Sequence, residues 1–287
     1  MSYYPLPNAA PTNPFTNTNN LIVSGTSPGD VHKIDSRLDQ NWSERWRSFL
    51  RVSKGWNNSD ALNYWNSPAT PGAGATLVGD VWSATLDNTI DFNPTLVLDL
   101  RYSLGRTTNL QGEYGQGFNI AKNLGIAQNI QTFSELQGSV FPYITMSGVA
   151  SNMGVSFGDS TAIFTSHNFV ASLTKIRGAH AIKVGGEYRK QLANYYQPCC
   201  STGIYPFSRQ FTQQEATTPN PNQGYLLADL LIGLQDYGQT ATIPQPALAS
   251  GYYGMYIQDD WKITRRLTLN VGLRYEITTP HTERYNT

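Results

Sequence analysis

Long apolar runs are absent from this chain. Nothing in its 287 residues approaches the roughly 18 consecutive apolar residues that a membrane-spanning helix needs. Charged residues are scarce too, at 14% against about 25% in an average soluble domain, and the net charge is zero. This charge balance gives no reason to expect a nucleic-acid partner. Any membrane role must therefore be carried by strands.

Catalytic and metal-binding patterns are missing as well. The sequence has no nucleophile elbow and no phosphate-binding loop. Asp259 and Asp260 look like a carboxylate pair, but neighbouring strand residues point to opposite faces and cannot act together. We expect no enzyme activity, no catalytic or metal-binding residue and no cofactor. The histidines are scattered without metal-ligand spacing, at His32, His167, His180 and His281.

Cysteine is limited to one adjacent pair, Cys199 and Cys200. Three states fit the sequence: two free thiols, a disulfide between the neighbours, or bridges to another part of the protein. In an oxidising surface loop a disulfide is favoured over thiols. A metal site would need more Cys or His close by in the sequence, and none is there.

What the sequence does contain is strand-like alternation of apolar and polar residues. In YYGMYIQDDWKITRRLTLNVGLRYE (252–276), Tyr253, Met255 and Ile257 share one face of a strand, and Leu269 and Leu273 share one face of the next. The pattern recurs and predicts antiparallel hairpins at about 31–56, 82–105, 161–193 and 250–277. We expect their tight turns near 43–45, 93–95, 176–179 and 262–266.

Aromatic residues gather at both ends of these strands, on the apolar face. Such belts are typical of membrane barrels, where amphipathic rings sit at the headgroup level. A soluble β-sandwich also alternates and remains an alternative, although its core has no reason to place aromatics at both rims. The predicted aromatic girdle comprises Trp42, Trp46, Trp56, Trp82, Phe92, Tyr102, Tyr253, Trp261 and Tyr275.

The connections between hairpins are long, at about 57–81, 106–160 and 194–249, whereas the turns within hairpins are short. This asymmetry is the outer-membrane arrangement, with short periplasmic turns and long extracellular loops. We expect the long loops to be disordered in the isolated chain and to carry any ligand site. The predicted ligand residues are Tyr114, Phe118, Tyr195, Tyr196 and Tyr205.

One stretch of the last long connection, YLLADLLIGL (225–234), fits a short amphipathic helix with Leu227, Leu230, Leu231 and Leu234 on one face. A strand continuation is the alternative.

The opposite face of the strands carries charges of both signs, which should pair with one another. In a barrel these side chains would face the lumen. The predicted lumen-facing residues are Arg37, Asp39, Arg47, Arg51, Asp99, Arg101, Glu187, Arg189 and Arg274.

The fold class predicted is therefore all-β: an antiparallel transmembrane β-barrel fragment, as an open curved sheet or partial barrel with long extracellular loops. The first twenty residues lack the basic and apolar regions of a signal peptide. We expect residues 1–30 to be a polar loop at a truncated start and residues 31–287 to form the partial barrel.

Several spaced segments resemble Oar-like TonB-dependent receptors. They are NPTLVLDLRYSLGR (93–106), FPYITMSGVASNMG (141–154), LTKIRGAHAIKVGGEYRKQLANYYQ (173–197), GIYPFSRQFTQ (203–213), GYLLADLLIGL (224–234) and GYYGMYIQDDWKITRRLTLNVGLRYEITTPHTERYN (251–286). The resemblance implies a bacterial outer-membrane barrel of about 22 strands, the size that carries a plugged lumen. No plug, TonB box or closing strand is found in this sequence.

The resemblance also implies a function: binding and uptake of an unknown extracellular substrate. The expected partners are outer-membrane lipid, that substrate, and a plug domain and TonB system reached through other parts of the protein. A surface barrel for adhesion or export support, without import, is the alternative.

Overall fold

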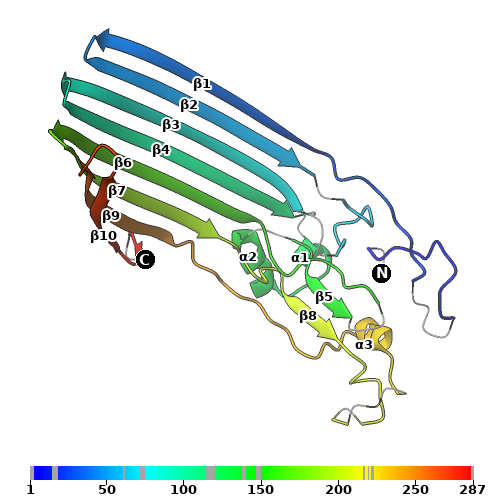
Figure 1. Cartoon of the computed structure of the whole chain (residues 1–287). Helices are drawn as coiled ribbons and strands as arrows, with labels where there is room; N and C mark the ends of the chain where they lie inside the picture. Colours follow the sequence, from blue (N-terminus) through cyan, green and yellow to red (C-terminus); the bar gives the residue numbers. More distant parts are fainter. Residues whose placement is uncertain are drawn as a thin grey trace.

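A computed structural model shows the chain as one large antiparallel sheet with a small packed layer at one end (Figure 1). The residues that the structure describes are 3–14, 19–60, 62–71, 75–113, 120–137, 140–146, 150–215, 217–218, 220 and 223–285.

The sheet is an up-and-down meander. Each strand pairs antiparallel with its neighbour, and the sheet is open, because β1 pairs only with β2 and β10 only with β9. The all-β antiparallel class predicted from the alternation is confirmed. The strands, in spatial order, are β1 (Gly29–Ser43), β2 (Trp46–Ser59), β3 (Ala75–Asn93), β4 (Leu96–Glu113), β6 (Ser160–Arg177), β7 (His180–Tyr196), β9 (Ala247–Lys262) and β10 (Thr268–Thr278), and the short β11 (Thr282–Glu283) also pairs with β9.

The predicted hairpins are present, with tight turns where alternation placed them. Leu86 lies opposite Tyr102 and Ile90 opposite Leu98, so β3 and β4 have the expected register. Gly178 completes the β6–β7 turn with a φ of 60°, a left-handed conformation that glycine adopts without steric cost. The strands are longer than predicted: β3 has 19 residues. Its additional residues, 75–81, still pair with β4 although their alternation is weak.

The described parts of the long connections lie at the end of the sheet away from the tight turns, where they fold into a compact layer that we call the cap (Figure 1). A two-stranded parallel sheet of β5 (Tyr143–Met146) and β8 (Ile204–Phe207) forms its centre. The cap helices are α1 (Ile120–Asn123), α2 (Gln128–Gln137) and α3 (Leu226–Ile232). Its buried core consists of Ala69, Phe141, Met146, Met153, Phe207 and Leu226.

Segments far apart in the sequence meet in this core. Tyr3, in the region expected to be a free polar loop, packs edge-on against Phe141 with ring centroids 5.4 Å apart, and Tyr4 packs on Trp65 at 4.9 Å. The expectation of disordered loops is wrong for the described residues, because apolar side chains from the start of the chain and all three long connections bury one another.

Helix α3 confirms the helical alternative for 225–234 but not its predicted face. Leu226 is buried, and Leu227 and Leu230 pack on the cap core. Leu231 and Leu234 are exposed instead. Among the described residues, no helix is long and apolar enough to cross a membrane.

Candidate functional site

The candidate site is the sheet itself, whose two faces differ in chemistry. Residues paired across strands point to the same face, so the register assigns each side chain. One surface, which we call the apolar face, includes Leu38, Leu50, Leu86, Leu98, Leu173, Val184, Ile257, Leu273 and the predicted aromatics Trp46, Trp56, Trp82, Tyr102, Tyr253, Trp261 and Tyr275.

No other element of the described chain covers the apolar face. Met255 is 68% exposed, Leu273 73% and Leu38 67%. A soluble sandwich would bury these side chains against a second sheet. The exposed sheet surface therefore contradicts the sandwich interpretation.

Aromatic pairs mark the tight-turn end of this face. Trp42, at a bulge beside the β1–β2 turn, packs against Trp46 with centroids 5.4 Å apart, and its Nε1 donates a hydrogen bond to Ser48 Oγ at 2.9 Å. Trp261 stacks on His180 at 5.3 Å. Phe92 lies at the matching bulge of β3 and is 50% exposed.

Toward the cap, Trp56 stacks on His32 at 5.1 Å, and Trp82 lies opposite Lys54. Ten residues separate Trp46 from Trp56 along β2. At about 3.3 Å per residue and a tilt near 40°, they span about 25 Å of height, the apolar band of an outer-membrane barrel. The strands extend past this level toward the cap.

Between the two belts, four rings form a continuous row across β4, β6, β7 and β9. We call it the aromatic ladder: Tyr102, Phe169, Tyr188 and Tyr253. Tyr102 and Tyr253, predicted as belt residues, belong to this row, because Tyr102 lies opposite Leu86 and Tyr253 opposite Tyr188. Successive ring centroids are 4.5, 6.3 and 5.0 Å apart. The Tyr102 hydroxyl is also hydrogen-bonded to His167 Nδ1 at 2.8 Å. The sequence did not reveal this ladder, because it exists only in the register that joins four strands.

The opposite surface, which we call the charged face, carries all the predicted lumen-facing residues. By register they share one side: Arg37, Asp39, Arg47, Arg51, Asp99, Arg101, Glu187, Arg189 and Arg274.

Charges on this face neutralise one another, as predicted, both across strands and along them. Arg101 Nε donates to the buried Asp87 at 2.6 Å, and Arg51 Nη2 donates to Asp35 at 3.0 Å across β1 and β2. Arg37 and Asp39 pair along a single strand at 2.7 Å.

Glu187 lies between two cations on the same face. Arg189 Nη2 donates to it at 2.5 Å, and Arg274 lies 3.9 Å away. Arg274 Nη2 also donates to the Tyr252 hydroxyl at 2.8 Å. Because the positive and negative side chains are paired, the charged face is polar but has little net charge.

The predicted ligand tyrosines do not come together. Tyr195 and Tyr196 are neighbours on β7 and point to opposite faces. Tyr205 packs on the cap core, where burial raises its pKa, and its hydroxyl has no hydrogen-bond partner among the described residues. Tyr114 and Phe118 lie outside the described residues.

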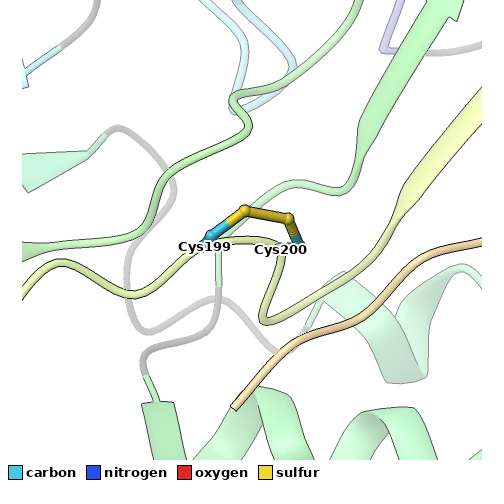
Figure 2. Close-up of a disulfide and its surroundings, with 2 residues drawn as sticks. All are labelled: Cys199 and Cys200. Carbon is cyan, nitrogen blue, oxygen red and sulfur yellow. A yellow bond between two sulfur atoms is a disulfide. The ribbon is translucent and has the colours of Figure 1, made fainter. Parts of the chain in front are cut away.

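The cysteines form a disulfide between neighbouring residues, the second of the three states considered (Figure 2). Cys200 is buried and its backbone N–H donates to Ser156 O at 2.9 Å. The pair therefore lies where the segment after β7 meets the one before β6.

The carboxylate neighbours behave as strand geometry requires. Asp259 pairs with His180 Nδ1 at 2.6 Å on the apolar face, close to the tight turns, whereas Asp260 accepts a hydrogen bond from Gln258 at 3.0 Å on the other face. Within the described ranges no group of three or more His, Cys, Asp or Glu is placed to hold a metal ion.

Comparison with known protein families identifies the family of this chain. The family model described as "Outer membrane beta barrel domain" matches residues 1–287. A search of curated proteins found no match. The outer membrane transporter YddB from Escherichia coli is similar in structure, with a TM-score of 0.52 and 9% identity, over 88% of this chain and 28% of that one. BauA, the ferric preacinetobactin receptor from Acinetobacter baumannii, gives a TM-score of 0.47 and 12% identity, over 90% and 35%.

This chain thus spans about a third of the length of these two proteins. The family match covers every strand described above and places the chain in the bacterial outer membrane. The chain belongs to the outer membrane beta barrel domain family.

Proposed function

We propose that this sheet is a section of the transmembrane wall of an Oar-like, TonB-dependent receptor that binds an extracellular substrate and imports it. In this proposal the apolar face contacts lipid, the charged face lines the lumen, and the cap is extracellular. The observation that carries the proposal is the uncovered apolar face with aromatics at both ends. Membrane barrels expose such a face, and water-soluble monomers do not.

The energetics favour lipid as the solvent of this face. Each fully buried Leu, Ile or Met side chain gains about 1.5–3 kcal/mol relative to water. Exposed residues such as Leu38, Met255 and Leu273 lose most of that gain in water and recover it in hydrocarbon. The charged face has the opposite preference, because its ion pairs need water to solvate their remaining donors and acceptors.

The sheet edges support a larger barrel. β1 and β10 each leave one row of backbone groups unpaired. Unpaired edges are not tolerated in hydrocarbon, so further strands must close the wall. A barrel of about 22 strands has room for a plug in its lumen. The plug and the TonB system are the proposed partners, contributed by other parts of the receptor.

The cap is the proposed substrate-capture surface. Long outer loops on a rigid barrel commonly carry binding residues. Tyr195 is 46% exposed at the cap end of β7 and is the most accessible of the described ligand candidates, with Tyr196 beside it. Tyr205 would support the cap core more than contact substrate. Tyr114 and Phe118 remain candidates. Rings and amides of this kind suit a neutral polar substrate, such as an oligosaccharide, a peptide or a metal chelate.

Uptake by whole cells tests the proposal. A strain lacking the receptor would be complemented with the wild-type gene or with a Tyr195→Ala variant, and offered labelled oligosaccharides, peptides and ferric chelates. We expect accumulation of one class to require the receptor, to stop when the proton-motive force is collapsed, and to fall in the variant.

An unchanged accumulation profile in the deletion strain, together with weaker surface attachment, would instead support adhesion. Accumulation that continues without the proton-motive force would contradict TonB coupling but not substrate binding by the receptor.

A further inference from the structure

The apolar face carries a groove immediately beside the aromatic ladder. Its volume is about 540 Å³. Leu100, Ala171, Gly186 and Met255 line the side toward the tight turns, and the ladder rings, with Leu86 in the same row, line the other side. Ala171 and Gly186 are direct partners on β6 and β7, so the floor of the groove has almost no side chain. The ladder stands as a wall above this floor.

Basic side chains lie beyond that wall, on the side toward the cap. Lys190 and His167 are partners one pair above the ladder, and Arg106 lies one pair further along β4. Two residues along a strand correspond to about 6.6 Å, so these side chains begin just past the rings. Going from the tight turns toward the cap, one therefore meets first the apolar groove, then the aromatic ladder and then the cations.

Arg106 and Lys190 are unpaired among the described residues. Neither Arg106 nor Lys190 has a hydrogen bond or ion pair to any described side chain, whereas Lys54, on the same face, is neutralised by Asp80 at 2.6 Å. Almost every cation of the charged face that was described above has a carboxylate partner. Two free cations on the apolar face, on the cap side of the aromatic ladder, are the complement of an anionic headgroup.

We propose that this groove holds an acyl chain of a phosphate-bearing lipid, whose phosphate lies between Arg106 and Lys190. The inference rests on the proposed orientation of the sheet in the membrane, which puts the site in the leaflet on the cap side. The bare floor at Gly186 admits the chain, which runs along the ladder, and Arg106, opposite Trp82 of the cap-side belt, brings the phosphate to the headgroup level. His167, hydrogen-bonded to Tyr102, helps to fix the position of that ring.

Lipid retention measured by native mass spectrometry tests the site. The complete barrel would be purified in mild detergent and given phosphatidylglycerol or uncharged diacylglycerol with the same acyl chains. We expect phosphatidylglycerol to be retained preferentially. Arg106→Gln and Lys190→Gln should each weaken retention about five-fold, and the double variant about thirty-fold, since a basic residue at a membrane surface contributes roughly that factor.

Two further variants separate the parts of the site. Gly186→Leu fills the groove, where a Cβ meets only the Gly254 carbonyl oxygen at 3.4 Å, and should reduce retention of both lipids. Lys175→Gln is the matched control: this lysine lies on the same face near the tight turns, hydrogen-bonded to Thr95, and its loss should change nothing.

Equal retention of the two lipids, or full retention by the double variant, would overturn the inference. So would a second copy of the polypeptide in place of lipid in the spectra. Heat-modifiable gel mobility reports barrel folding separately. A wild-type barrel that folds in bilayers but shows no lipid preference refutes only the lipid site, whereas failure to fold in any bilayer refutes the proposed function and this site with it.

Discussion

An arginine at Leu86 should distinguish the two faces of the sheet. Leu86 lies on β3, six residues from Phe92 and four from Trp82, and is therefore close to the middle of the proposed apolar band. Its side chain is 45% exposed on the apolar face, opposite Leu50 and Tyr102. A charged side chain here must either enter hydrocarbon or bend toward an interface.

The expected cost of Leu86→Arg is about 2–4 kcal/mol in the free energy of unfolding, the value for Arg at a bilayer midplane. That corresponds to about a 30- to 900-fold change in the folding equilibrium constant. The matched control is Ser83→Arg, three residues away on the charged face, where Asp35 and the open site at Gly105 offer a wet, partly acidic environment. We expect it to cost less than about 1 kcal/mol.

The assay is denaturant-induced unfolding of the complete barrel in lipid vesicles, followed by tryptophan fluorescence and gel mobility. Comparable destabilisation by the two substitutions, or a larger cost at Ser83, would refute the assignment of faces.

Three further outcomes are expected. Arg101→Ala should lower the free energy of unfolding by about 1–2 kcal/mol, because the buried Asp87 loses its 2.6 Å partner; a double-mutant cycle with Asp87→Asn that shows no coupling would contradict this. Phe141→Ala should lower the stability of the cap by about 3–5 kcal/mol and abolish hydrogen-exchange protection in 140–146 and 150–157 while β3 and β4 keep theirs; loss of protection throughout would mean that cap and sheet fold as one unit. Thiol labelling of the unfolded, unreduced chain should leave Cys199 and Cys200 unmodified and should modify both after reduction; labelling before reduction would exclude the disulfide.

Strand positions and faces could be predicted from the sequence because both depend on local alternation. The period of two in 82–92 and 96–104 fixes which side chains share a face, and the polar turn at Asn93 fixes the register. The ends of β3 and β4 were underestimated, because residues 75–81 lose alternation but continue the backbone ladder begun by their neighbours.

The cap could not be predicted because its contacts are non-local. Tyr3, Trp65 and Phe141 belong to three separate segments, and the sequence of each segment gives no indication of the residues it packs against. The aromatic ladder and the neighbouring cations Arg106 and Lys190 could not be predicted either, because their placement depends on the register of four strands. Tyr205 looked like a surface residue in a polar loop, and only the packing of β8 shows it on the core.

Spin-label scanning of β4 tests the proposed orientation of the sheet in the membrane. Single labels would be placed at each position from Val97 to Leu104 in the complete barrel, reconstituted in lipid. We expect labels at 98, 100, 102 and 104 to collide with oxygen dissolved in the bilayer, and labels at 97, 99, 101 and 103 to collide with a water-soluble nickel complex. Accessibility without this alternation, or with the two sets reversed, would show that the apolar face does not contact lipid.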